Sequence, residues 1–301
     1  MRDPRELSSK EGRALLAQVA EADPRLLILT GGDPSRRDDV MEMIREAAGR
    51  GLRVAFSPGA TPDLLALDFS ELKEAGVWRV SLSLDGATAA DHNAFRGVSR
   101  AWDWTMRAVE KLHAAGIPFQ INSSITASNI ASFDALACTV ESLHPAGWTI
   151  FLVVPTGRAG VSDLPAAGDV ETLFEKLLEL SKRVDFEIRT TEGQHYRRLL
   201  ARQGADQAAP TNGARGFVFV SHTGDICPSG FLPVVGGNVR RDSLLATYRN
   251  APEFVALRDS SNLQGKCGRC PFNRICGGSR ARAYATTGNL FAEDPLCSYQ
   301  P

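Results

Sequence analysis

The chain has 301 residues, of which 43% are hydrophobic, and its 34 Lys and Arg residues nearly balance its 35 Asp and Glu residues. A chain of this length can bury a full core in one large or two modest domains. A formal net charge of -1 gives no reason to expect nucleic acid or an anionic membrane surface as a partner. No apolar run approaches the roughly 20 residues that span a bilayer, so we expect no membrane association through a spanning helix.

From residue 1 to 205 the chain alternates short apolar runs with longer amphipathic stretches. Ser8 or Ser9 is expected to cap a first helix, with Glu11 in its first turn. We expect strands at residues 26–29, 53–57, 80–84, 119–122, 150–154 and 186–189, and helices at 40–48, 102–115, 133–143 and 170–183. This alternation predicts βαβ units and a parallel sheet. Six strands without a dinucleotide fingerprint after the first favour an α/β barrel or open barrel over a Rossmann sheet.

A polar stretch rich in Gly and Ala follows, and we place a linker at residues 206–214. The predicted domains are therefore 1–205, a partial barrel, and 215–301, a small β-rich unit. In the second unit, strands at 216–220 and around Ile226 flank a turn, and a short helix is expected near 243–248. So little apolar material predicts that this unit needs a metal to hold its fold.

Five of the six cysteines lie in the last quarter of the chain. Cys267, Cys270 and Cys276 are closely spaced, and Cys297 stands near the C-terminus. Thiolates two or three residues apart can face one ion or cluster, and a distant fourth ligand ties the tail to that turn. A disulfide framework is typical of small secreted domains and is not expected here. On spacing alone, a structural zinc site and an iron–sulfur cluster fit equally well, and reduced cysteines indicate the cytoplasm.

At these residues the chain resembles radical S-adenosylmethionine (SAM) enzymes with a C-terminal SPASM or twitch domain. Gly31, Gly32, Asp33 and Pro34 resemble the family's GGEP loop. The run of residues 81–86, followed by Asp91-His92 and Phe95-Arg96-Gly97, resembles its SLDG…HDxxRG signature. Cys267-x2-Cys270-x5-Cys276 with Cys297 downstream resembles the auxiliary-cluster motif, which favours one [4Fe–4S] cluster over zinc.

The resemblance implies a (β/α)6 TIM-like barrel and a set of residues that contact SAM. This expected set comprises Gly31, Gly32, Asp33, Pro34, Ser83, Asp85 and Asn122, with Arg158 as a candidate partner for a carboxylate. The segments at residues 227–233, 237–240 and 277–283 are most similar to proteins of the alternative haem biosynthesis branch of this family. That branch implies a porphyrin-like or peptide substrate, and a reductant such as ferredoxin or flavodoxin.

The sequence differs from the family pattern at several positions, and each difference leads to a further expectation. The family's CxxxCxxC motif, which holds the SAM-binding cluster, is absent, so we expect a barrel lacking its first strand, in a chain that is truncated or naturally degenerate. A second [4Fe–4S] cluster is expected only if such a motif lies upstream. Asp33 replaces the family's Glu, and Arg280 stands where full SPASM domains have another cysteine.

Several single residues remain to be assigned. Cys227 occupies a position of the family's first auxiliary cluster, and it is a possible extra ligand, a substrate contact or a buried thiol. Lys266, Arg269, Arg274 and Arg280 are candidates to offset the cluster's charge, or form a solvated basic loop. Cys138 is expected in the core, and His195 at a solvated helix start.

Three functions fit these patterns. The first is a radical SAM enzyme in which reductive SAM cleavage drives radical modification of the substrate, and which is inactive as the chain is written. The second is a non-catalytic, cluster-bearing binding or partner protein. The third is a zinc-stabilised barrel protein.

Overall fold

The computed structural model describes residues 3–204 and 212–301. Most of the predicted linker, residues 206–211, lies outside the described residues. Contacts group the chain into two compact units, one of Met1–Ser123 with Ser132–Thr149 and the other of Ser124–Ala131 with Ile150–Pro301. The division into domains at 1–205 and 215–301 stays a prediction.

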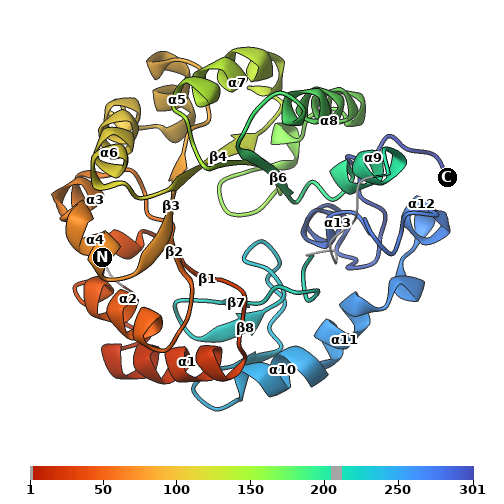
Figure 1. The fold of residues 1–301 in the computed structure, drawn as a ribbon. Helices are drawn as coiled ribbons and strands as arrows, with labels where there is room; N and C mark the ends of the chain where they lie inside the picture. Colours follow the sequence, from red (N-terminus) through yellow and green to blue (C-terminus); the bar gives the residue numbers. More distant parts are fainter. Residues whose placement is uncertain (1–2, 205–211) are drawn as a thin grey trace. The chain divides into compact units, whose positions relative to one another are not determined.

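Six strands form one sheet and follow one another in chain order (Figure 1). They are β1 (Leu27–Leu29), β2 (Val54–Phe56), β3 (Val77–Ser83), β4 (Phe119–Ile125), β5 (Gly147–Leu152) and β6 (Glu187–Thr191). The pairs β1–β2, β2–β3 and β3–β4 are parallel. Each overlaps a predicted strand, and the sequential order differs from the 3-2-1-4-5-6 order of a Rossmann sheet. The predicted (β/α)6 barrel-type fold is confirmed.

Helices alternate with these strands, as the apolar periodicity predicted. They are α1 (Ser9–Glu21), α2 (Val40–Gly49), α3 (Pro62–Ala66), α4 (Phe69–Glu74), α5 (Ala89–Arg96), α6 (Ala101–Ala115), α7 (Phe133–Ser142), α8 (Ala167–Ser181) and α9 (Tyr196–Arg202). The expected cap of α1 is confirmed: Ser8 accepts from the Glu11 amide, and Glu11 accepts from the Ser8 amide. No helix in the described ranges has both the length and the apolar composition to cross a membrane.

Trp148 anchors the core of the first unit. It is fully buried, stacks on Phe133 at 5.5 Å between ring centroids, and donates from Nε1 to Ser123 Oγ at 2.9 Å. Cys138 was expected in this core, and that prediction is wrong because its thiol is exposed. The buried face of α7 carries Phe133, Leu136, Ala137 and Val140, and position 138 is off that stripe.

The C-terminal residues build a second, smaller sheet. Its strands are β7 (Phe219–Val220), β8 (Asp225–Cys227) and β9 (Gly237–Asn238), paired antiparallel in that order. The helices that follow are α10 (Leu244–Asn250), α11 (Pro252–Arg258), α12 (Gly265–Arg269) and α13 (Arg280–Thr287). The fully buried Phe254 and Ile226 provide part of its small apolar core.

Candidate functional site

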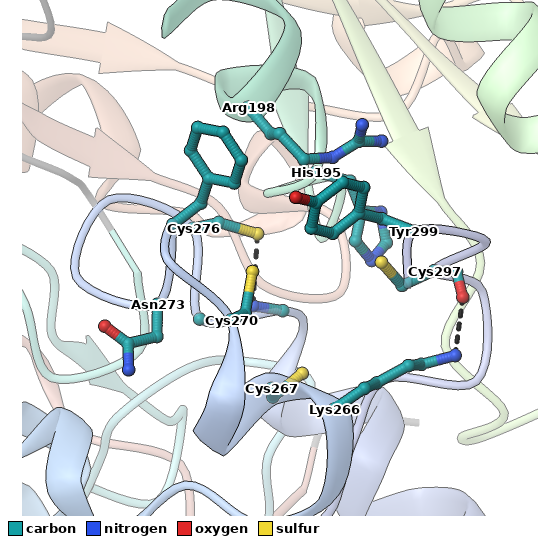
Figure 2. Close-up of a pocket in the computed structure, with 12 residues that line it drawn as sticks. His195, Arg198, Lys266, Cys267, Cys270, Asn273, Cys276, Cys297 and Tyr299 are labelled. Carbon is teal, nitrogen blue, oxygen red and sulfur yellow. Dashed lines mark hydrogen bonds between the residues drawn. The ribbon is translucent and has the colours of Figure 1, made fainter. Parts of the chain in front are cut away.

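Four cysteines line a single pocket in the second unit (Figure 2). Cys267 lies on α12 and Cys270 caps its end, while Cys276 precedes α13 and Cys297 belongs to the C-terminal tail. In Figure 2 the sulfur atoms of Cys270 and Cys276 point toward one another. The remaining lining residues are His195, Arg198, Lys266, Phe272, Asn273, Gly277, Gly278 and Tyr299. A set of four thiols suits an iron–sulfur cluster or zinc.

Burial disfavours the thiolate form of three of these cysteines. Burial raises the pKa of Cys276 to about 12 and also raises the pKa values of Cys267 and Cys297. Metal binding to these groups must therefore release protons. In residues 3–204 and 212–301, no three His, Cys, Asp or Glu side chains form a group that could hold one metal ion.

Hydrogen-bond donors reach two of the sulfurs and one cysteine carbonyl. The Gly278 amide donates to Cys276 Sγ at 3.4 Å, and Arg280 Nη2 donates to Cys267 Sγ at 3.8 Å. Lys266 Nζ donates to the Cys297 carbonyl oxygen at 2.6 Å. Of the four basic residues considered from the sequence, Arg280 and Lys266 reach the site, whereas Arg269 and Arg274 are exposed.

The loop between Cys276 and α13 depends on two glycines. Gly277 and Gly278 have φ of 70° and 63°, in the left-handed region. A Cβ at Gly278 would lie 2.8 Å from both the Arg280 guanidinium and Asp294 Cβ, and 3.4 Å from Cys267 Sγ. Glycine therefore lets the chain turn sharply beside two of the thiols.

Asp294 carries a buried carboxylate whose contacts connect the C-terminal tail to the rest of the second unit. Its side chain is fully buried and accepts from Arg282 Nη1 at 2.9 Å, the Ser279 amide at 2.7 Å and the Leu296 amide at 3.0 Å. Burial by itself would raise the pKa of Asp294, but the nearby Arg282 and His195 hold it well below its usual range. An ionised carboxylate thus sits three residues before Cys297.

Arg282 joins this carboxylate to the ends of two barrel strands. It is fully buried, and donates to the backbone oxygens of Leu152, at the end of β5, and of Val153 next to it. It also donates to the oxygen of Glu192, the residue that follows β6. Backbone carbonyls at the carboxyl ends of β5 and β6 are therefore satisfied by a side chain from α13.

Glu192 stands out by its backbone and its burial. It has φ of 54°, and its side chain accepts from Ser279 Oγ and, at 3.4 Å, from Ser229 Oγ. Burial raises its pKa, against the Ser279 hydrogen bond and the charge of Arg282. The sequence reasoning missed Glu192, Arg282 and Asp294, because the contacts that join Arg282 and Ser279 to Glu192 and to the end of β5 span 87 to 130 positions. It was also wrong about His195, which is 1% exposed rather than solvated.

Cys227 was an open assignment. It ends β8, is buried, and is not among the residues that line the four-thiol pocket. Burial raises the pKa of its thiol, and the charge of Asp225 adds to this. The geometry favours the buried-thiol alternative over ligation.

The expected SAM-loop residues lie in the first unit, where Asp33 makes internal contacts. Its carboxylate accepts from the amide of Ser35 at 3.1 Å and from Thr61 Oγ1 at 3.0 Å, so it joins the loop after β1 to the loop after β2. Gly31 and Gly32 are exposed, and Pro34 opens a 3-10 turn. Asp33 therefore acts here as a cap for the turn.

Two other predicted contacts lie side by side. Ser83, the last residue of β3, is the register partner of Asn122, which lies within β4. Asp85 is buried and pairs with Arg96 at 2.6 Å, while its amide donates to His92 Nδ1 at 3.1 Å. Arg158 is exposed and belongs to the other unit.

Gly86 shows why the SLDG motif ends in glycine. A Cβ there would lie 2.5 Å from the backbone nitrogen of His92 and 2.6 Å from Asp91 Cβ. We expect Gly86→Ala to lower the free energy of unfolding by about 1–3 kcal/mol, because α5 must move away from the strand end. Urea unfolding checks this, with Gly49→Ala as control, since a Cβ at Gly49 in α2 meets nothing within 4 Å. Equal effects of the two substitutions would contradict the close approach.

His92 predicts an acid-sensitive stability. Burial, with the charge of Arg96, lowers its pKa to about 4, from about 6.5 in the unfolded chain. Below about pH 6.5 the unfolded chain takes up a proton that the folded chain does not, so stability falls as the pH drops toward 4. Between pH 7 and 5 we expect wild type to lose about 1–2 kcal/mol more than His92→Gln in urea unfolding. His222 is exposed, so we expect His222→Gln to lose as much stability as wild type between pH 7 and 5.

The comparisons agree with this fold and its motifs. Residues 1–128 match the family model of the radical SAM superfamily. The AdoMet-dependent heme synthase of Nitratidesulfovibrio vulgaris is 38% identical over 315 residues, covering 99% of this chain and 85% of that protein. The mycofactocin maturase MftC of Mycobacterium tuberculosis is 30% identical, covering 98% and 76%. The solved structure of Streptococcus suis SuiB bound to precursor peptide SuiA has a TM-score of 0.76 at 15% identity, covering 97% and 70%. The chain belongs to the radical SAM superfamily.

Proposed function

We propose that the chain carries one auxiliary [4Fe–4S] cluster on Cys267, Cys270, Cys276 and Cys297, and serves radical modification of a porphyrin-like substrate. The observation that carries the first half is that all four of these cysteines line one pocket. When bound, the cluster supplies one-electron transfer. Arg280, the Gly278 amide and Lys266 supply donors or charge beside its ligands, which stabilises an anionic group.

The pocket between the four cysteines is narrow. The pocket has a free volume of about 20 Å³, close to the space of one water molecule. The tail that carries Cys297 is held beside the pocket by Lys266 and by the hydrogen bonds of Asp294.

The substrate class rests on the relatives. The heme synthase is 38% identical to this chain, against 30% for the peptide maturase, so a porphyrin is favoured and a peptide is the second candidate. Ser83 and Asn122 are the residues we propose for SAM contact, with Gly31, Gly32 and Asp33 in the loop after β1. A ferredoxin or flavodoxin is the class of reductant that such chemistry needs.

The 301 residues contain no CxxxCxxC motif. We propose that this polypeptide does not cleave SAM by itself, and that any reductive cleavage requires three thiolates from outside this sequence. Incubation with SAM and dithionite should release no 5′-deoxyadenosine. Release at a rate above that of the protein-free control would contradict this proposal.

Metal analysis tests the cluster. After anaerobic purification and reconstitution, we expect about four irons and four sulfides for each chain and little zinc. One zinc without labile sulfide would reject the cluster and favour the zinc-stabilised barrel. Titration with iron-coproporphyrin III should then shift the Soret band, and the absence of binding would remove the porphyrin proposal while leaving the cluster intact.

A further inference from the structure

Three exposed arginines flank the four-thiol pocket. Arg202 is the last residue of α9, Arg269 is the last residue of α12, and Arg274 lies in the loop that follows. Arg269 directly precedes Cys270 and Arg274 directly follows Asn273, and both of these neighbours line the pocket. We call the three arginines the cationic rim of the pocket.

The sequence concentrates positive charge in the segments that supply the rim. Residues 193–204 contain three Arg and no Asp or Glu, and residues 264–292 contain five Lys or Arg and again no acidic residue. The whole chain has a formal net charge of -1, so this excess is local. A surface patch of one sign attracts oppositely charged partners and raises their rate of association.

The rim arginines keep their charge available to a partner. In residues 3–204 and 212–301, none of the three forms an ion pair with a carboxylate. Two other basic residues that line the pocket differ in this respect, because Arg198 pairs with Glu171 at 2.5 Å and Lys266 lies 4.0 Å from Glu293. The rim can therefore bind carboxylates that this chain does not itself supply.

Two half-buried aromatic rings lie in the pocket wall beside the rim. Phe272 and Tyr299 line the pocket together with the cysteines, and their ring centroids are 5.7 Å apart. The Arg202 guanidinium lies 5.1 Å from the Tyr299 centroid and 5.8 Å from the Phe272 centroid. Arginine and aromatic side chains are the residues that protein interfaces favour. A protein that covers these two rings would come within one side chain of the ligand sulfurs.

We propose that the cationic rim, with Phe272 and Tyr299, is the docking site of a small acidic one-electron carrier of the ferredoxin or flavodoxin class. One electron passes from the reduced carrier to the oxidised cluster, and no covalent bond forms or breaks. The proposal rests on the proposed function, since it requires a cluster on the four cysteines.

The position of the rim favours a protein over a small ligand. None of its three arginines is among the residues that line the pocket, so their charge is presented beside the pocket rather than inside it. Electron-transfer complexes have small interfaces, and charge complementarity mainly sets how fast they form. A few unpaired guanidiniums around two rings suit such a brief encounter.

Reduction kinetics of the reconstituted chain test the docking site. The probe is an acidic flavodoxin in its hydroquinone form, and stopped-flow absorbance follows the cluster. Three charge reversals make the test variant: Arg202→Glu, Arg269→Glu and Arg274→Glu. Three reversals at other exposed positions make the matched control: Lys10→Glu, Arg25→Glu and Arg241→Glu. We expect the second-order rate constant to fall about tenfold in the test variant, and to stay within about twofold of wild type in the control.

Salt and a second electron donor separate docking from a change in the cluster. Raising NaCl from about 0.05 M to about 0.5 M should lower the flavodoxin rate of wild type about tenfold, and this measurement needs no variant. Reduced methyl viologen is a small cation, so its rate should not fall in the test variant. A flavodoxin rate that responds neither to salt nor to the reversals would overturn the docking site, and so would equal losses with both donors.

Iron and sulfide assays precede the kinetics. A wild-type chain without a cluster overturns the proposed function and the docking site together, whereas a full cluster with unchanged flavodoxin rates overturns the docking site alone. If the test variant loses its cluster, Arg202→Glu alone replaces it, because Arg202 lies outside the cysteine loops, and a smaller loss of rate is expected. Weaker binding of iron-coproporphyrin III with an unchanged flavodoxin rate would assign the rim to the substrate and overturn the proposal.

Discussion

Replacing Arg282 by methionine is expected to lower the free energy of unfolding by about 3–5 kcal/mol, because it leaves the buried carboxylate of Asp294 without its main counter-charge. Arg282 is fully buried, and its guanidinium also satisfies the backbone oxygens of Val153 and Glu192. Methionine fills similar space but supplies no donor. For a chain of this size we expect a melting temperature lower by roughly 6–20 °C.

A double variant separates the charge from the packing. Adding Asp294→Leu to Arg282→Met removes both members of the ion pair, so the pair of changes should destabilise by less than the sum of the two single changes. Arg241→Met is the matched surface control, because the Arg241 side chain is 73% exposed, and we expect a change within about 0.5 kcal/mol. Strict additivity in differential scanning calorimetry and urea unfolding would show that Arg282 and Asp294 act independently.

The second large effect concerns the cluster ligands. We expect each of Cys267→Ser, Cys270→Ser, Cys276→Ser and Cys297→Ser to lower bound iron and sulfide several-fold after identical reconstitution, because a serine oxygen is a poor substitute for a thiolate. The loss should also destabilise the C-terminal part of the chain, since metal-binding free energy adds to folding free energy. Iron and sulfide assays, with limited proteolysis of the tail, measure both effects.

Two cysteines outside the pocket give matched controls. Cys138→Ser alters an exposed thiol and should leave iron and sulfide contents at the wild-type level. Cys227→Ser should do the same, since Cys227 is buried at the end of β8 and does not line the pocket. A full cluster in Cys297→Ser, or its loss in Cys227→Ser, would require a different set of ligands.

The sequence predicted the barrel-type sheet because its signals are local. Each apolar run of four or five residues precedes or follows an amphipathic helix, and Ser8 with Glu11 marks the start of α1. The four cysteines were also predictable as one site, since close spacing of three thiols limits where they can lie. Ser83 and Asn122 were both expected to contact SAM, and they are register partners on neighbouring strands.

The remaining features depend on contacts that local patterns do not report. His195 lies in a polar run and was expected to be solvated, yet Asp294, nearly a hundred residues later, meets its ring. The contacts of Asp33 with Thr61 and of Asp85 with Arg96 also join residues that no local pattern connects, and the expected SAM contacts of the two carboxylates stay a prediction. Cys138 is different, because the spacing of Phe133, Leu136, Ala137 and Val140 did contain the signal that position 138 faces outward.

Gly277 and Gly278 have a consequence for protein engineering. Transplanting only the cysteine spacing onto another scaffold would not reproduce the pocket, because any side chain at position 278 would meet Arg280, Asp294 and Cys267. A graft needs the two glycines and the acidic residue of the tail as a set. The smallest set of residues to transplant is therefore the turn at Gly277 and Gly278 together with Asp294.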